Sequence, residues 1–165
     1  MLGGQHLDVA LSLDHLATAL GFTPQRQEAE SLLRRALAIR EKNLGPEHRD
    51  VAASVGRLAF YLNTNDTVKE AEALYRRALQ LDEKNYGPEH PAVTARLTSL
   101  AFMLKAQRRY LEAEPLFERI VQIRTKAFGP KSPATQQALT DVAKLRQSMT
   151  AKPAAKAPAP STPSK

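Results

Sequence analysis

The sequence predicts an all-α solenoid, a stack of helical hairpins, and a recurring phrase carries this prediction. Leu44-Gly45-Pro46-Glu47-His48 returns as Tyr86-Gly87-Pro88-Glu89-His90 and then as Phe128-Gly129-Pro130-Lys131-Ser132, with the glycines 42 residues apart. A fixed period of this length is typical of architectures in which each unit buries its apolar face only against its neighbours. Between the phrases apolar residues return at helical spacing, and no stretch alternates with the period of a strand.

Each period predicts two amphipathic helices. In the middle period the apolar face of the first helix is formed by Leu58, Ala59 and Leu62, and that of the second by Ala71, Leu74, Tyr75, Ala78 and Leu79. These positions follow the i, i+3, i+4, i+7 spacing of one helix face. The sequence therefore predicts one helical hairpin in every period.

The helix ends carry matching signals. Thr67 followed by Glu70 predicts a capping box at the start of the second helix of the middle period, and Thr23 before Pro24 predicts the same start one period earlier. A glycine follows each second helix and precedes a proline, which predicts a left-handed helix terminus at Gly45, Gly87 and Gly129.

Several motifs in register resemble the tetratricopeptide repeat, and more narrowly its 42-residue variant in kinesin light chain. The first helices share a Leu-Ala pair, and the second helices share an alanine followed by a leucine or aromatic residue; they are Leu16-Ala17, Leu58-Ala59, Leu100-Ala101, Ala29, Ala71, Ala113, Leu33, Tyr75 and Phe117. The Glu28-Ala29-Glu30 run and the Leu-Gly-Pro-Glu-His phrase add to the likeness. The resemblance implies a right-handed superhelix of helix-turn-helix repeats.

The period also predicts the domain boundaries. We expect residues 1–149 to form one domain of three repeats, at about 7–48, 49–90 and 91–132, closed by a capping helix over 133–148 in which Leu139, Val142 and Ala143 cover the preceding repeat. Pro115 predicts a bend in the last second helix. Residues 150–165 are Ala, Pro, Lys, Ser and Thr, a composition that predicts a disordered tail.

Composition narrows the class of protein. The net charge is +7, but three of the lysines lie in the tail, and no basic stripe with aromatic residues indicates nucleic acid. The absence of cysteine excludes disulfides and thiolate metal sites. No run reaches the ~18 apolar residues of a membrane span, and no basic leader stands at the start. We expect a soluble, cytoplasmic protein with no membrane partner.

No catalytic or metal-binding constellation is found in the sequence. It contains no phosphate-binding glycine loop, no His-Glu-x-x-His and no nucleophile elbow. His6, His48 and His90 stand one period apart, so they cannot converge on a metal, and a loop or capping role is expected instead. We expect a non-catalytic protein without cofactor or metal.

The resemblance places function on the concave surface, which the first helices line in this family. Its register assigns to a peptide-binding groove Asp14, His15, Arg57, Phe60, Asn63, Ser99, Phe102, Lys105 and Lys144. Aromatic rings beside an arginine suit an extended peptide. The alternative is that Phe60 and Phe102 pack between adjacent first helices as core residues.

Partners are constrained but not identified. We expect a scaffold or adaptor that binds a protein or peptide. The chaperone C-terminal peptide is disfavoured, because the lysines and asparagines of the family's carboxylate clamp are replaced here by Asp14, Thr18, Arg57, Ala95 and Ser99. Leu7 and Leu11, one turn apart at the end of the stack, suggest weak homodimerisation. Two other classes stay open: a regulatory fragment of a larger enzyme or signalling protein, which the start at Leu2-Gly3 favours, and a basic nucleic-acid-associated protein.

Overall fold

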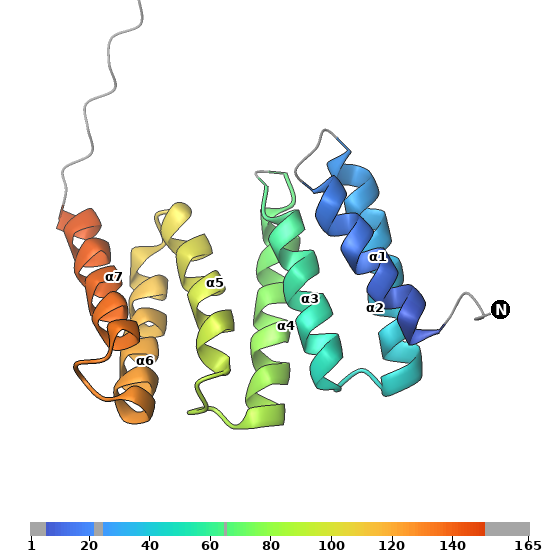
Figure 1. Cartoon of the computed structure of the whole chain (residues 1–165). Helices are drawn as coiled ribbons and strands as arrows, with labels where there is room; N and C mark the ends of the chain where they lie inside the picture. The colour runs from blue at the N-terminus through green and yellow to red at the C-terminus, as the bar shows by residue number, and fades with distance from the viewer. Residues whose placement is uncertain (1–5, 22–24, 65, 151–165) are drawn as a thin grey trace, which may run out of the picture.

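The computed structural model describes residues 6–21, 25–64 and 66–150, and within these ranges the chain forms helices and no strand. The helices follow one another along a single stack (Figure 1). They are α1 (Leu7–Leu20), α2 (Arg26–Leu44), α3 (Arg49–Leu62), α4 (Val68–Tyr86), α5 (Val93–Ala106), α6 (Tyr110–Phe128) and α7 (Pro133–Thr150). The all-α solenoid predicted by the period is confirmed.

Each helix packs chiefly against its neighbours in the chain, so α1 pairs with α2, α3 with α4 and α5 with α6, while α7 lies on α6. Alanines at the helix contacts allow this close approach. The alanines of the Leu-Ala pairs, Ala17, Ala59 and Ala101, are 0% exposed, as are Ala36 and Ala78 of the second helices. The main apolar core runs from α1 to α7, and Ala36 belongs to a smaller cluster between α1 and α2 with Ala10, Leu13 and Ile39.

The recurring phrase forms the loop that joins one repeat to the next. Its glycines have φ of 85, 91 and 83°, a region that residues with a Cβ rarely adopt. Their ψ values are extended, between 151 and 160°, so they differ from the left-handed helical terminus that the sequence predicts. An extended ψ leads the chain away from the helix axis towards the next first helix.

His6 and His48 cap the helices that follow them, as predicted, whereas His90 makes the equivalent bond in the turn before α5. The Nδ1 atoms of His6, His48 and His90 each accept a hydrogen bond from the backbone N–H two residues later, at 3.3, 3.2 and 3.1 Å. Ser132 stands at the same place in the last loop, where its hydroxyl accepts from the N–H of Thr135 at 3.2 Å. His6, His48 and Ser132 thus satisfy amide donors at helix starts, and His90 satisfies the N–H of Ala92 just before α5.

One local prediction is wrong, and the bend at Pro115 stays a prediction. The capping box at Thr67 does not form, because the Thr67 hydroxyl donates instead to the carbonyl of Leu62, and Glu70 pairs with Arg34 of α2. Pro115 lies inside α6, which runs on as one helix to Phe128. Thr23 and Pro24 lie outside the described residues.

Helix α7 lies on α6 through a face different from the predicted one. Its buried side chains are Thr135, Ala138, Val142 and Leu145. Of the three residues predicted to cover the preceding repeat, Val142 is buried, but Leu139 is 44% exposed and Ala143 is also exposed. The predicted tail begins at the last residue of α7, and residues 151–165 lie outside the described part of the chain.

Candidate protein-binding surface

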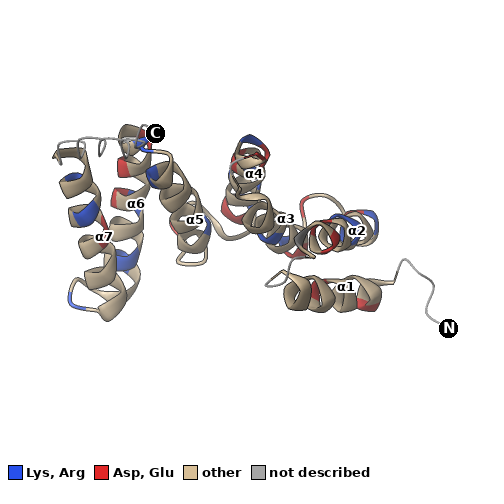
Figure 2. Ribbon diagram, turned by 90° about the horizontal axis from the view of Figure 1, so that it is seen from above, with Lys and Arg blue, Asp and Glu red and all other residues tan. Residues whose placement is uncertain are grey.

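The first helices of the repeats, α1, α3 and α5, lie on the inner side of a curved stack, and α7 lies at its end beside α6 (Figure 2). Helices α1, α3, α5 and α7 each have exposed or half-buried residues at a spacing of i, i+4, i+7, the pattern of one helix face. These residues form the inner stripe: Leu11, His15 and Thr18; Ala53, Arg57 and Phe60; Ala95, Ser99 and Phe102; Gln137, Asp141 and Lys144.

Two aromatic rings stand on the inner stripe. Phe60 is 62% exposed and contacts only its neighbour Tyr61 edge to face among the described aromatic rings, with centroids 5.7 Å apart. This exposure excludes a core role for Phe60. Phe102 is 42% exposed and lies edge to face on Phe117 of α6 at 5.1 Å, so one side of the ring is packed and the other is open. The Nζ of Lys105 lies 5.9 Å from the centroid of the Phe102 ring.

Asp14 does not face the surface as the family register predicts, because its side chain is only 3% exposed. Its Oδ2 accepts a hydrogen bond from Arg40 of α2 at 2.6 Å and forms an ion pair with Nη1 of Arg57 of α3 at 2.5 Å. Arg40 also donates to the hydroxyl of Ser54 at 2.6 Å. The carboxylate therefore joins two repeats and holds Arg57, whose side chain is 39% exposed, at the edge of the stripe.

The other predicted residues are spread along the stripe and form no single pocket. His15, Asn63 and Lys144 are exposed, Lys105 is half-buried, and Ser99 donates its hydroxyl to the carbonyl of Ala95 at 3.1 Å. They lie on α1, α5 and α7, and Asn63 directly follows α3. Such an arrangement can contact an elongated ligand at several points, but it brings no two titratable groups together for chemistry.

A second buried ion pair, which is not among the residues predicted from the sequence, joins the middle and last repeats. Asp82 of α4 accepts from the Nε of Arg96 of α5 at 2.9 Å. Burial raises the pKa of Asp82, while the guanidinium opposes this shift. The guanidinium lies across Gly56 of α3, where a Cβ would clash with it. Asp82 stands 42 residues after Arg40, so the same repeat position has a charged residue at both junctions. Alignment of the repeats could therefore have predicted this second ion pair.

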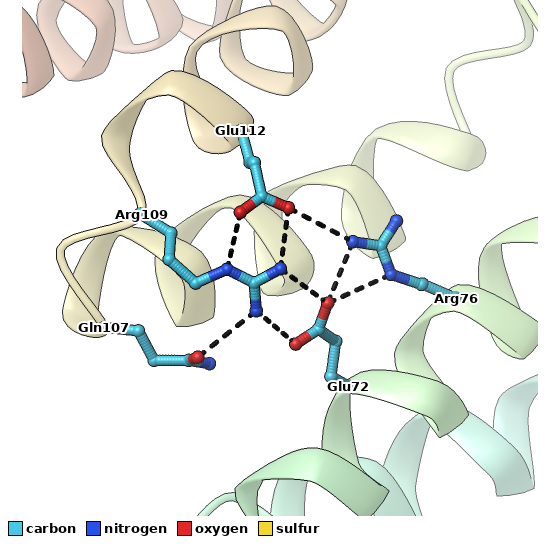
Figure 3. A network of polar contacts seen from close by, with 5 residues as sticks. All are labelled: Glu72, Arg76, Gln107, Arg109 and Glu112. Carbon is cyan, nitrogen blue, oxygen red and sulfur yellow. Dashed lines mark hydrogen bonds and ion pairs between the residues drawn. The ribbon is translucent and has the colours of Figure 1, made fainter.

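On the outer side, ion pairs connect the second helices. Figure 3 shows Arg109 between Glu72 of α4 and Glu112 of α6, with Arg76 beside both carboxylates. The hydrogen bond from Arg109 holds the pKa of Glu72 below its usual value, and the same residue lowers the pKa of Glu112. These cations already have carboxylate partners, so they offer no unpaired basic patch to a polyanion.

Two cavities lie away from the inner stripe. One of about 350 Å³ is lined by Pro88, Glu89, Arg119, Gln122, Ile123 and Lys126, and the other, also about 350 Å³, lies between α6 and α7 beside Leu139 and Val121. Within the described ranges no three His, Asp or Glu side chains are grouped in a way that could hold a metal ion. No described helix is long and apolar enough to cross a membrane.

These observations define a class: a helical-repeat solenoid with an exposed inner stripe. Models of the tetratricopeptide repeat match residues 9–50, 51–92 and 92–157. The chain belongs to the tetratricopeptide repeat family. No curated protein sequence matches it significantly.

Solved structures place the chain near the kinesin light chain variant of the family. A kinesin-light-chain-type protein of Podosopora anserina with nearly identical TPR-like repeats is 30% identical, with a TM-score of 0.74, and the match covers 87% of this chain and 68% of that one. BtubC from P. vanneervenii is 19% identical with a TM-score of 0.70, over 99% of this chain and 74% of that one, a likeness that shows the fold. The predicted resemblance to kinesin-light-chain-like repeats is confirmed.

Proposed function

We propose that this chain is a non-catalytic scaffold or adaptor whose inner stripe binds a peptide segment of a partner protein. Repeats of this family generally mediate protein–protein interaction. The observation that carries the proposal is Phe60, a ring 62% exposed on the concave side, close to Arg57 in sequence and on the same helix face. Exposed aromatic residues and arginine are the types that dominate interface energetics.

The chemistry of the stripe favours an extended peptide with apolar side chains and at least one carboxylate. Phe60 and the open side of Phe102 offer ring faces to apolar groups. Arg57 keeps donors beyond the one that binds Asp14, and Lys105 and Lys144 add positive charge along the same surface. The expected cytoplasmic location stays a prediction from the sequence.

Selection from a random peptide library tests this proposal, because it requires no identified partner. We expect selected peptides to bind the wild-type chain and to bind Phe60→Ala about 30-fold more weakly, since truncation of an interface anchor costs on the order of 2 kcal/mol. Phe128→Ala is the matched control, because Phe128 is a 54% exposed phenylalanine at the end of α6, outside the stripe.

The stability of Phe60→Ala separates a binding role from a packing role. An exposed ring predicts a change in the free energy of unfolding within about 0.5 kcal/mol. If selected peptides bind Phe60→Ala and Phe102→Ala as tightly as the wild type, the inner stripe is not the binding surface.

A further inference from the structure

The N-terminal end of the stack leaves uncovered an apolar position that later repeats bury. Leu16 of α1 is 47% exposed, whereas its equivalents one and two periods later, Leu58 and Leu100, are 1% exposed. Val9 is half-buried, whereas its equivalents are 0% exposed; they are Val51 and Val93. Leu58 and Leu100 each have a preceding repeat beside them, so Leu16 and Val9 mark the face that receives a repeat. We call this surface the N-terminal face.

Leu7 and Leu11, the residues predicted to form an apolar patch at this end, do not belong to the N-terminal face. Leu11 is 50% exposed, but its equivalents Ala53 and Ala95 are exposed as well, so this position lies on the inner stripe in each of these repeats. Leu7 is half-buried. Self-association through these two leucines stays a prediction.

The ion pairs between repeats indicate which charges a helix packed on the N-terminal face would need. Arg34 and Glu41, seven residues apart on α2, pair with Glu70 and Arg77 of α4 at 2.8 and 2.5 Å. The preceding helix thus presents arginine and then glutamate. Helix α4 presents glutamate and then arginine at the facing positions, so the two pairs fix α2 and α4 in parallel register.

The next junction uses the same arrangement. Arg76 and Glu83 of α4 face Glu112 and Arg119 of α6 at 3.9 and 2.5 Å. The two junctions share one order of charges. At each of them the later second helix, α4 or α6, pairs with an Arg and a Glu, seven residues apart, on the preceding second helix, α2 or α4.

Helix α2 has, at the N-terminal face, the glutamate and arginine that in α4 and α6 pair with the preceding second helix. Glu28 and Arg35 are seven residues apart and stand 42 residues before Glu70 and Arg77. Both are exposed, and neither has an ion-pair partner among the described residues. The opposite end of the stack does not supply the complement, because Glu118 and Thr125 of α6 replace the arginine and the glutamate. Copies of this chain are therefore mismatched for head-to-tail stacking.

We propose that the N-terminal face docks a helical hairpin of a partner protein, whose last helix presents an arginine and, seven residues later, a glutamate. These two side chains pair with Glu28 and Arg35, and the apolar side of the hairpin covers Leu16 and Val9. This docking surface is separate from the inner stripe, so a peptide and a hairpin partner can be held by one chain at the same time.

The chain itself contains a hairpin with an arginine and a glutamate at the required spacing. A labelled 42-residue peptide of residues 49–90 carries Arg76 and Glu83, and its binding to the full chain is measured by fluorescence anisotropy. We expect saturable binding in the ten to hundred micromolar range. Leu16→Gln in the full chain should weaken it at least about tenfold. Leu111→Gln, a control at an 80% exposed leucine of α6, should leave binding unchanged.

Reversal of the charges tests the proposed pairing itself. The peptide with Arg76→Glu and Glu83→Arg should bind the wild-type chain about tenfold more weakly, because two attractive pairs become two repulsive ones. The Glu28→Arg/Arg35→Glu chain should bind this reversed peptide as the wild-type chain binds the original. Equal binding of both peptides to the wild-type chain would overturn the proposal.

A tethered form removes the dependence on folding of the free peptide. The same 42 residues, joined to the N-terminus of the full chain, should raise the melting temperature by about 5 °C with the original charges and by clearly less with the reversed charges. No difference between the two forms overturns the proposal. So does a dimer of the unmodified chain in sedimentation that Leu16→Gln dissociates, because the occupant of the face is then a second copy.

Discussion

Arg57 of α3 reaches back to the buried carboxylate of Asp14 on α1, with an N–O distance of 2.5 Å. This contact links the core of the stack to its inner stripe, because Asp14 is 2% exposed and Arg57 lies at the surface. The same oxygen also accepts from Arg40. One buried carboxylate therefore fixes the first two repeats relative to each other and sets the direction of a proposed binding residue.

Asp14→Ala should destabilise the fold strongly. The change leaves Arg40, which is 9% exposed, without its carboxylate, and breaking a buried ion pair from one side costs on the order of 3 kcal/mol. Urea unfolding followed by circular dichroism measures the loss. Asp50→Ala is the control, because Asp50 lies in the first turn of α3 with its side chain 54% exposed. Equal effects of the two substitutions would contradict the role given to Asp14.

Gly21→Ala should destabilise the chain through a single contact. Gly21 has an ordinary right-handed φ of −64°, so its backbone accepts alanine, but an added Cβ would clash with Cε1 of Tyr61. Displacing that ring, which is 8% exposed, should cost roughly 1–3 kcal/mol. In a Tyr61→Ala background the same substitution should be neutral or stabilising, as thermal unfolding of the four proteins would show. A cost that persists in that background would place the strain elsewhere.

His48→Ala should cost about 0.5–1 kcal/mol, since the start of α3 then loses the acceptor for the N–H of Asp50. His48→Ser should keep most of the stability, because Ser132 performs the same function at the start of α7. His15→Ala, at an exposed position inside α1, serves as the control in thermal unfolding. If alanine and serine at position 48 behave alike, the cap contributes nothing.

The ion pairs of Figure 3 predict a pH dependence of stability. Because Arg109 lowers the pKa of Glu72 in the folded state, this carboxylate stabilises the fold above its unfolded pKa of about 4.3, and the contribution is lost as the pH falls through the lower folded value. Arg109→Gln should therefore be less stable than the wild type at pH 7, with a difference that shrinks below about pH 4.

Urea midpoints measured from pH 3 to 7 test this dependence. Lys69→Gln provides the control, because Lys69 is exposed on α4 and has no ion-pair partner among the described residues. A difference between Arg109→Gln and the wild type that stays constant over this range would rule out the electrostatic explanation.

The fold could be predicted because its signals are local and repeated. Helical spacing, the glycine of each loop and the alanines of the contacts recur every 42 residues, so each unit supports the assignment of the next. Side chains with distant partners could not be predicted. The family register assigns Asp14 to the surface. Its burial depends on Arg40 and Arg57, which lie 26 and 43 residues away and so leave no local signal.

Other errors have equally specific causes. The hydroxyl of Thr67 found a closer acceptor in the carbonyl of Leu62, so the capping box did not form. Leu139 stands where Val55 and Leu97 are 0% exposed, but those residues have the second helix of their own repeat beside them. Alignment of the repeats identifies both Leu139 and Leu16 as apolar residues that lack the neighbouring helix present beside their equivalents.

We propose that the chain binds a partner through the inner stripe of its first helices, and one measurement tests this binding directly. At 18.2 kDa the chain suits two-dimensional NMR, and addition of a library-selected peptide maps the contact residue by residue. We expect shift changes centred on Arg57, Phe60 and Phe102 and their loss in Phe60→Ala. Shift changes confined to the second helices α2, α4 and α6, with the inner stripe unperturbed, would contradict the proposal.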